Sequence, residues 1–440
     1  MTPPSASSEH ATIVCVDDES IVLTSLREQF ERHLGGFEVE VAQDAAEALE
    51  IIDELRAAGV TVPVVISDHI MPGMKGDEFL VRVHALLPDT RTILLTGQAG
   101  VEAVGRAING AGLYRYLTKP WDRDDLTLTV REAIRSYQSE RQVRAQQARL
   151  AAAHEAAMRF VPSEFLGLLG RAELADVRLG DFVSQPVSVY YSDIRSYTAL
   201  VEGRSPAENL AWINEYLGCM EGPIHRHGGF VEGVAGDAII ALFGTGADAV
   251  VRAAIESQHA LRECNVTRVR RGDPPLSIGI GINTGECLLG VLGGAERLKC
   301  GVVGDAVNLA ARVEGLTKHL GTVLITGETR DALADPGRFA LRYVDRVQVK
   351  GRTAPTSLYE VLDGLGDAER ARKQATAGRL AEALALFQAR DLAGAGAALD
   401  ELTRVDPDDP AIRWHRARVE RFSTQGLPTD WDGTTRLDSK

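Results

Sequence analysis

The stretch CGVVGDAVNLAARVE, residues 300–314, decides how the centre of this chain is interpreted. Val307 to Glu314 predicts a helix, and a spacing of four residues places Asn308 and Arg312 on one face of it. A guanidinium is a rigid fork of hydrogen-bond donors that suits phosphate, and an asparagine amide can orient a ribose. A surface salt bridge would explain Arg312 equally well, so the motif needs support from the sequence around it.

Two aspartates upstream of this helix lie at the ends of predicted strands. The run VSVYYSDIRSYT predicts an apolar strand that delivers Asp193 to its end. The run GGFVEGVAGDAIIALFG alternates as two short strands, with Ala235-Gly236 at the tight connection and Asp237 beside it. Carboxylates at adjacent strand tips can hold two divalent cations, which activate an attacking oxygen and stabilise a leaving phosphate.

Four motifs taken together resemble the class III adenylate and guanylate cyclases. The resemblance covers about residues 160–362 and implies a ferredoxin-like α+β domain that works as a head-to-tail homodimer. Each active site would be shared between the two chains. The motifs are Ser192-Asp193-Ile194-Arg195, Gly236-Asp237, the run Gly279–Glu286 and GDAVNLAAR.

The same resemblance implies a reaction and the residues that carry it. The 3′-hydroxyl of ATP would attack its own α-phosphorus, releasing pyrophosphate and leaving 3′,5′-cyclic AMP, while an arginine stabilises the charge that builds up. One chain would bind two Mg²⁺ or Mn²⁺ ions and the other would contact the nucleotide. The implied residues are Asp193, Ile194 and Asp237 for the metals, and Asn308, Arg312 and Lys350 for the nucleotide.

The residues that should read the base depart from the family pattern. Adenylate cyclases of this family carry a lysine four residues before the second metal aspartate, and an aspartate or threonine four before the aspartate of the GDxVN motif; here these positions are Gly233 and Gly301. Guanylate cyclases use Glu and Cys there, and Glu232 and Cys300 stand one residue upstream. Strand alternation turns them to the other face unless a bulge intervenes. ATP is therefore expected first, GTP or relaxed base choice second, and a degenerate phospho-dependent scaffold stays open.

The first third of the chain alternates strands with helices. Apolar runs end at Asp17, Asp68 and Thr96, and a fourth leads to Lys119, a pattern that predicts a doubly wound parallel sheet with its polar groups at the strands' carboxyl ends. Asp17 and the adjacent Asp18 could instead cap a helix.

This arrangement resembles the receiver domain of two-component response regulators, with a flavodoxin-like fold over roughly residues 10–137. By that resemblance Asp68 accepts a phosphoryl group from a cognate histidine kinase and shares a Mg²⁺ with Asp17 and Asp18. Phosphorylation would add negative charge at Asp68, and the activity that it changes must belong to a later part of the chain. The residues implied to respond to the phosphoryl group are Thr96, Tyr116 and Lys119.

Helices connect and follow these two domains. Residues 124–160 contain no Gly or Pro and predict one long helix, in which Val130 and Tyr137 share a heptad position that would make a marginal coiled coil. Residues 366–425 have helical periodicity and resemble a TPR-like helical hairpin that should pack on the cyclase domain or across the dimer. The polar end wraps a surface or frays. The expected divisions are 10–137, 138–182, 183–363 and 366–440.

Composition limits the remaining options for this 440-residue multidomain α/β chain. A net charge of −14 argues against nucleic acid as a partner, and no apolar run approaches the roughly 18–20 residues that membrane insertion needs. The five cysteines are scattered without a CxxC spacing. This fits reduced thiols in the cytoplasm better than a disulfide framework or a zinc site.

Overall fold

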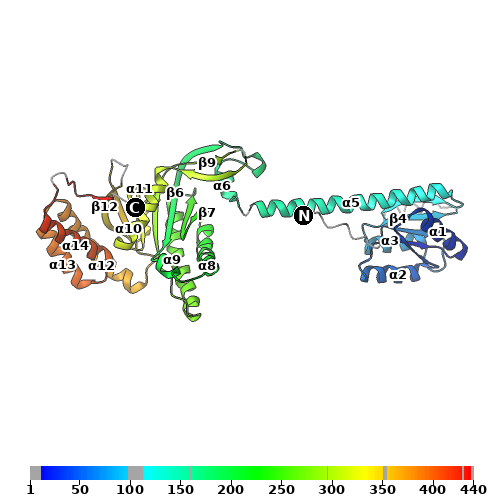
Figure 1. The fold of residues 1–440 in the computed structure, drawn as a ribbon, viewed down its shortest axis with the longest axis horizontal. Coiled ribbons are helices and arrows are strands. Elements are labelled where there is room, and N and C mark those ends of the chain that lie inside the picture. The colour runs from blue at the N-terminus through cyan, green and yellow to red at the C-terminus, as the bar shows by residue number, and fades with distance from the viewer. Residues whose placement is uncertain are drawn as a thin grey trace. The chain divides into compact units, whose positions relative to one another are not determined.

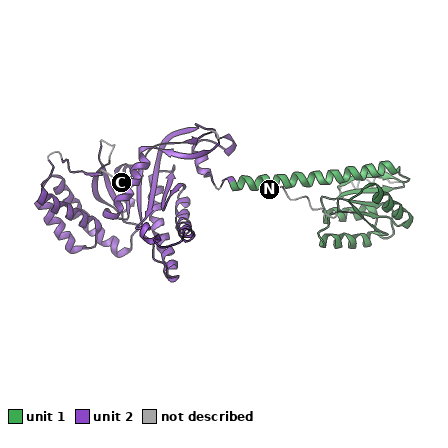
Figure 2. Ribbon diagram, in the orientation of Figure 1, with its two compact units in different colours: residues 1–156 green, residues 157–440 purple. Residues whose placement is uncertain are grey.

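The chain forms two compact units, residues 1–156 and 157–440, and each is described here by itself (Figure 2). Among the described residues, no helix combines the length and the apolar character that crossing a membrane requires. The computed structural model describes residues 11–97, 112–158, 160–294, 296–349, 354–428 and 431–437.

The first unit is built on a five-stranded parallel sheet in the order β2-β1-β3-β4-β5. This is the flavodoxin-like order, and it confirms the predicted doubly wound sheet. β1 and β3 are buried along their whole length, which explains why their sequences are continuous apolar runs rather than alternating ones. The strands are β1 (Thr12–Val16), β2 (Glu38–Ala42), β3 (Val64–Asp68), β4 (Arg91–Thr96) and β5 (Leu113–Thr118).

Helices cover both faces of this sheet (Figure 1). One face packs against α1 and α5 through residues such as Phe30 and Val130, and the other against α2 and α3 through Ile52 and Phe79. The helices are α1 (Ser20–His33), α2 (Ala45–Ala57), α3 (Gly76–Leu86) and α5 (Arg123–Met158).

The long helix α5 confirms the prediction of a continuous helix but corrects its proposed seam. Val130 is fully buried in the core of the first unit, so it is not available for a coiled coil. Beyond the core of the first unit the helix surface is exposed, and its large apolar side chains there include Val143 and Leu150. Arg144 of α5 pairs with Asp89 in the turn before β4.

The second unit contains a mixed sheet in the order β14-β12-β13-β11-β9-β6-β8-β7, with β10 paired to β9. Most pairs are antiparallel, whereas β9 and β11, and β12 and β14, run parallel. A mixed sheet with helices agrees with the α+β class expected for this part of the chain. The strands are β6 (Phe182–Ile194), β7 (Gly229–Ala235), β8 (Ala238–Phe243), β9 (Ile278–Gly293), β10 (Leu298–Val303), β11 (Val323–Thr326), β12 (Leu341–Val349), β13 (Thr356–Val361) and β14 (Thr435–Leu437).

The helices of this unit lie on both faces of the sheet. α8 and α9 pack on one face through a core that includes Tyr216 and Val250, while α6 and α10 pack on the other through Phe165 and Ala310. Short 3₁₀ turns occur at 174–176 and 336–338. The helices before the C-terminal bundle are α6 (Ser163–Leu168), α7 (Tyr197–Val201), α8 (Pro206–Arg226), α9 (Ala247–Arg270), α10 (Asp305–Leu320) and α11 (Gly327–Asp331).

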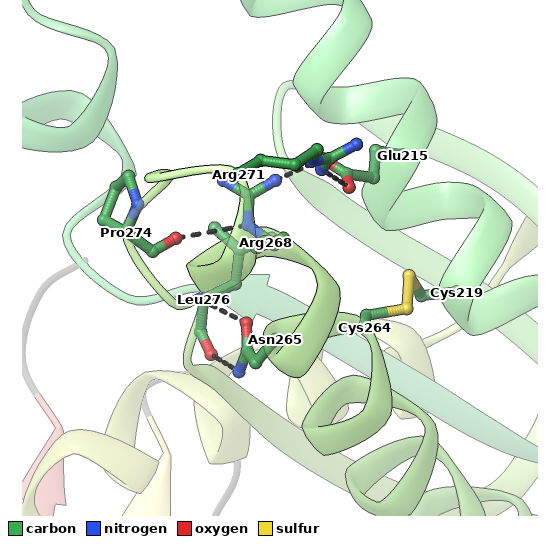
Figure 3. Close-up of a disulfide and its surroundings, with 8 residues drawn as sticks. All are labelled: Glu215, Cys219, Cys264, Asn265, Arg268, Arg271, Pro274 and Leu276. Carbon is green, nitrogen blue, oxygen red and sulfur yellow. Dashed lines mark hydrogen bonds and ion pairs between the residues drawn. A yellow bond between two sulfur atoms is a disulfide. The ribbon is translucent and has the colours of Figure 1, made fainter.

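The expectation of five reduced cysteines is wrong. Cys219 on α8 and Cys264 on α9 form a disulfide with their Cα atoms 6.6 Å apart (Figure 3). The two helices run antiparallel, since Glu215 of α8 also contacts Arg268 of α9 and Arg271, the residue directly after α9. The sequence separation of 45 residues carries no sign of this contact, because only the packing of α8 on α9 brings the thiols together.

The C-terminal segment folds as three helices that share a core with the sheet. Phe387 and Leu399 pack with Leu309 and Val313 of α10, so the predicted packing on the cyclase region is confirmed, whereas the TPR-like hairpin is not. The polar tail wraps the surface as β14, which extends the sheet next to β12. The helices are α12 (Asp367–Gln388), α13 (Leu392–Val405) and α14 (Pro410–Gln425).

Buried ions fasten these helices to the sheet. Arg342 of β12 pairs with Asp409, the residue that caps α14, and donates to Glu360 at 2.7 Å. Lys373 of α12 also donates to Glu360 at 2.7 Å. All four side chains are buried, with two positive and two negative charges that compensate each other.

Candidate active site and receiver site

Three carboxylates gather at the carboxyl end of the parallel sheet in the first unit. Asp17 follows β1 and is buried, Asp68 ends β3 and is buried, and Asp18 is exposed. One oxygen from each lies within 4.8 Å of the others, close enough for all three to bind one cation. The fold therefore brings together the three residues predicted to bind Mg²⁺.

Lys119 completes this cluster with a positive charge. Its Nζ lies 2.6 Å from Asp17 Oδ2 and 2.8 Å from Asp68 Oδ1. Burial alone would lower the pKa of Lys119, but the hydrogen bonds to both carboxylates raise it. Burial raises the pKa of Asp17, and the hydrogen bond from Lys119 opposes that rise. The lysine therefore stays charged and offsets the carboxylates.

The two remaining predicted switch residues lie on neighbouring strands. Thr96 ends β4 and is 1% exposed, and its Oγ1 has no hydrogen-bond partner among the described residues. Tyr116 lies on β5 and is 49% exposed. A buried hydroxyl without a partner is costly, so Thr96 Oγ1 is a donor ready for an oxygen at this edge.

In the second unit, Asp193 and Asp237 meet at the ends of adjacent strands. Asp193 lies near the end of β6, and Ala235 pairs with Ala238, so that Gly236 and Asp237 form the whole connection between β7 and β8. The predicted connection is thus displaced by one residue, and Asp237 lies in the turn itself. Gly236 adopts a φ of 68°, a left-handed conformation that glycine tolerates without strain.

The carboxyl group of Asp193 interacts directly with that of Asp237. Burial, followed by the hydrogen bond and charge of Asp237 and the charge of Glu314, raises the pKa of Asp193 to about 7. The backbone N–H of Ile194 donates to Asp193 Oδ1 at 3.1 Å and partly opposes this rise. A divalent cation would remove the same repulsion, so the donor set fits a metal site.

Helix α10 packs directly on β9 because two glycines allow it. A Cβ on Gly281 would lie 2.2 Å from the backbone nitrogen of Glu314, and one on Gly279 would lie 2.0 Å from Thr317 Oγ1. Asn283 on the same strand donates to the carbonyl oxygen of Ala306 at 3.3 Å. Gly279, Gly281 and Asn283 therefore position α10 against the sheet.

α10 presents Asn308 and Arg312 to a cavity of 1170 Å³ that Tyr191 and Asp193 also line. The helix thus holds the predicted amide and guanidinium on one face, as their spacing required. Lys350, the third predicted nucleotide contact, lies outside the described residues.

The strand that carries the base-reading positions contains a bulge. Val231 pairs with Ala241 and Gly233 pairs with Ile240, which leaves Glu232 as the extra residue on β7. A bulge of this kind turns two consecutive residues toward one face of the sheet. Strand alternation therefore does not separate Glu232 from Gly233.

Glu232 and Cys300 are electrostatic neighbours on that face. Only 9% of the Glu232 side chain is exposed, and its Oε1 lies 3.9 Å from Lys299 Nζ, next to Cys300 on β10. Burial and then the charge of Glu232 raise the pKa of Cys300, and burial raises that of Glu232. A Cβ on Gly233 would meet no atom within 4 Å, so this position is open.

Two family models match the chain. The response regulator receiver domain matches residues 13–131, and the adenylate and guanylate cyclase catalytic domain matches residues 183–362. The chain joins a receiver domain to a nucleotide cyclase catalytic domain. The matched ranges contain the carboxylate cluster at Asp68 and the pair at Asp193 and Asp237, respectively.

Known relatives resemble the two domains separately. An adenylate cyclase of Anabaena cylindrica is 39% identical over 210 residues, which are 46% of this chain and 42% of that protein. The hydrogenase transcriptional regulatory protein HoxA of Cupriavidus necator is 35% identical over 128 residues, 29% of this chain and 25% of that protein. The crystal structure of the guanylyl cyclase Cya2 shares 36% identity over 42% of this chain and 95% of that one, with a TM-score of 0.38. The chain spans less than half the length of these curated relatives.

Sequence reasoning missed one carboxylate of the cyclase domain. Glu314 is half-buried, its pKa is raised by burial, and it adds negative charge next to Asp193. It lies two residues after Arg312, so the only signal was its place inside the opening motif. Its proximity to β6 depends on the packing of α10 against the sheet.

Proposed function

We propose that this protein is a phosphorylation-regulated class III nucleotide cyclase that converts ATP to 3′,5′-cyclic AMP and pyrophosphate. The observation that carries the proposal is the half-buried pair of Asp193 and Asp237, of which Asp193 lines the same cavity as Asn308 and Arg312. Two acids, an amide and a guanidinium are the groups that intramolecular attack of a ribose hydroxyl on phosphorus needs. The adenylate cyclase name of the Anabaena relative supports ATP as the substrate.

Asp193 and Asp237 would hold two Mg²⁺ or Mn²⁺ ions, with Ile194 beside them. When bound, the cations supply charge that activates the 3′-hydroxyl and offsets the leaving pyrophosphate. Arg312 would stabilise negative charge on the oxygens of the α-phosphorus, and Asn308 would orient the ribose. Lys350 would meet the triphosphate.

Two copies of the chain would share each active site. The β9–β10 hairpin and the start of β6 expose large apolar side chains, which mark an interaction surface in a protein of this size. A second copy covering them would explain their exposure. The residues are Phe182, Leu288, Leu292 and Leu298, exposed by 66%, 37%, 44% and 49%.

Mixing two inactive variants tests the shared site. Asp193→Ala removes a metal carboxylate and Arg312→Ala removes the phosphate contact, so each is expected to be inactive alone. In mixed dimers one composite site would be intact and partial activity would return. Asp193 and Arg312 also line one cavity within a single chain. If well-folded mixed dimers stay inactive, each active site is therefore formed by one chain, and the shared site is refuted.

The activity itself is tested by incubating the full chain with Mn²⁺ and each of the four ribonucleoside triphosphates, then separating the products. Cyclic AMP as the main product would support the proposal. If no base yields a cyclic product, with or without a small-molecule phosphoryl donor, the chain is a phospho-dependent scaffold with a degenerate cyclase domain.

Regulation would begin at Asp68, phosphorylated by a cognate histidine kinase. The charge added there would be met by Lys119 and by the unpaired hydroxyl of Thr96. A phosphoryl donor is expected to change the cyclase rate of the wild type and to leave that of Asp68→Asn unchanged. An equal response in both proteins would refute control through Asp68.

A GTP-specific cyclase is the second candidate, and the bulge at Glu232 favours it. The bulge interrupts the alternation that would separate Glu232 from Gly233, and the half-buried Glu232 carboxylate is an electrostatic neighbour of Cys300. Glu232→Gln is expected to reduce any activity with GTP more than with ATP. Position 233 has room for a side chain, so Gly233→Lys should shift the substrate preference toward ATP. Unchanged preference in both variants would leave base choice to other residues.

A further inference from the structure

The cavity beside α10 extends well beyond the residues of the cyclase motifs. Its volume of 1170 Å³ exceeds the common range of small-ligand sites, roughly 300–1,000 Å³. The far wall comes from the C-terminal segment, which lies outside the matched cyclase range of 183–362. The lining residues from that segment include Trp414, Arg418, Arg421, Phe422, Trp431 and Arg436.

The two walls meet at a pair of stacked rings. His319 of α10 and Trp414 of α14 stack with their centroids 4.0 Å apart and their planes 22° apart. Burial and the charges of Lys318 and Arg195 lower the pKa of His319, so this ring is neutral at pH 7. The Trp414 Nε1–H is shielded from solvent and has no acceptor among the described residues. The Trp414 ring lines the cavity.

Charge in this cavity is mostly positive. Among the described lining residues, five cations stand against two carboxylates, Asp193 and Glu314, which belong to the acidic group near the metal site. Arg418 is committed to Asp345 at 3.1 Å, whereas Lys318 and Arg421 are exposed at the cavity. The cations are Arg312, Lys318, Arg418, Arg421 and Arg436.

We propose that the cavity between α10 and α14 binds a polyphosphate anion through Lys318 and Arg421, which makes the C-terminal helices part of the ligand-binding surface of the cyclase domain. Cations on both walls of the cavity match a ligand with several charges, and a guanidinium binds phosphate oxygens in pairs. The aromatic side chains of Trp414, Phe422 and Trp431 add a surface on which a nucleobase can lie. Binding of a polyphosphate does not require that the cyclase reaction takes place.

The test uses the full chain in EDTA, so that neither divalent cations nor turnover contribute. Inorganic tripolyphosphate is titrated and its binding is measured by calorimetry at low and at high salt. The wild type is expected to bind, and added salt to weaken the binding because exposed charges are screened. Lys318→Gln and Arg421→Gln should each weaken binding about tenfold, the factor for loss of one charge-assisted contact.

A matched control lies on the same helix. Arg416 is exposed, pairs with Asp400 at 2.6 Å and does not line the cavity, so Arg416→Gln should bind like the wild type. Urea midpoints verify that all variants are folded. If the wild type does not bind, or if binding survives both cavity substitutions, the proposal is overturned and any phosphate binding belongs to Arg312.

A second arm identifies the source of the phosphates. The α,β-methylene analogue of ATP is titrated under the same conditions, with Trp414→Leu as the variant. If the wild type binds the ATP analogue more tightly than tripolyphosphate, and Trp414→Leu reduces binding of the analogue to the tripolyphosphate level, the site binds a nucleotide. Equal binding of both probes assigns it to polyphosphate such as the released pyrophosphate. If the chain shows these binding effects but has no cyclase activity, the proposed function is refuted and the binding site is not.

Discussion

His415 of α14 makes the stability of the second unit depend on pH. The side chain is fully buried, Nε2 contacts the carbonyl oxygen of Val344 at 2.7 Å, and Nδ1 lies 3.2 Å from an Arg418 nitrogen. The neutral ring satisfies both contacts, with Nε2–H donating and Nδ1 accepting. A proton on Nδ1 would face the guanidinium. Burial and the charge of Arg418 lower the pKa of His415 from 6.5 to about 4, although Asp345 opposes the shift.

The sign and size of the effect follow from this shift. The unfolded chain takes up the proton first, so stability is complete above pH 6.5 and falls as the pH drops toward 4. Between pH 7 and pH 5 the loss is about 2 kcal/mol, since each pH unit inside the window is worth ~1.4 kcal/mol. His415→Gln keeps a donor for Val344 but does not titrate.

Urea unfolding at pH 5, 6 and 7, followed by tryptophan fluorescence, measures the effect. Three of the four tryptophans, Trp212, Trp414 and Trp431, report on the second unit. Carboxylates titrate in both proteins, so the relevant quantity is the difference between the pH dependences of the wild type and His415→Gln. The wild type is expected to lose about 2 kcal/mol more than the variant from pH 7 to pH 5. Parallel pH dependences would show that His415 is not held neutral and would refute the reasoning.

Three further perturbations test the packing around the cyclase domain. Asp409→Asn keeps the cap of α14 but leaves Arg342 with one buried counter-ion, so the free energy of unfolding in urea should fall by about 3–5 kcal/mol. The control Asp400→Asn removes an exposed carboxylate and should lower it by less than ~1 kcal/mol. Gly281→Ala places a methyl group against the backbone of α10 and should cost about 1–3 kcal/mol and most of the cyclase activity, whereas Gly218→Ala, with open space around it, should cost nothing measurable. Reduction of the Cys219–Cys264 disulfide, which closes a loop of 45 residues, should lower stability by about 2–4 kcal/mol in urea unfolding, and the double serine variant should not respond to reductant. Losses equal to those of the controls, or a reductant effect that persists in the serine variant, would contradict these assignments.

Local patterns predicted much of the receiver domain correctly. The apolar runs that stop at Asp17, Asp68 and Thr96 are buried strands whose ends meet at one edge, as parallel strands must. The segment without Gly or Pro is the helix α5. In these cases neighbours along the chain carry the information.

Predictions that depended on contacts distant in sequence failed or stayed open. Val130 and Tyr137 share a heptad position, but Val130 is buried in the core of the receiver domain and does not reach a coiled-coil partner. The bulge at Glu232 depends on how β7 pairs with β8, and strand alternation cannot reveal an extra residue. The C-terminal helices pack on one another and also bury apolar side chains against α10 and β12, so the TPR-like hairpin is not confirmed as a separate unit.

The sequence by itself determined the two domain types and the identity of the chemical groups, because motif spacing on a strand end or helix face is a local property. Only the tertiary structure decided which of those groups meet: Glu314 with Asp193, Glu232 with Cys300, and Cys219 with Cys264. It also placed Arg418 and Arg421 of α14 at the same cavity as α10. These encounters join segments far apart in the chain, and they are set by how whole helices and strands bury their apolar faces rather than by any local signal.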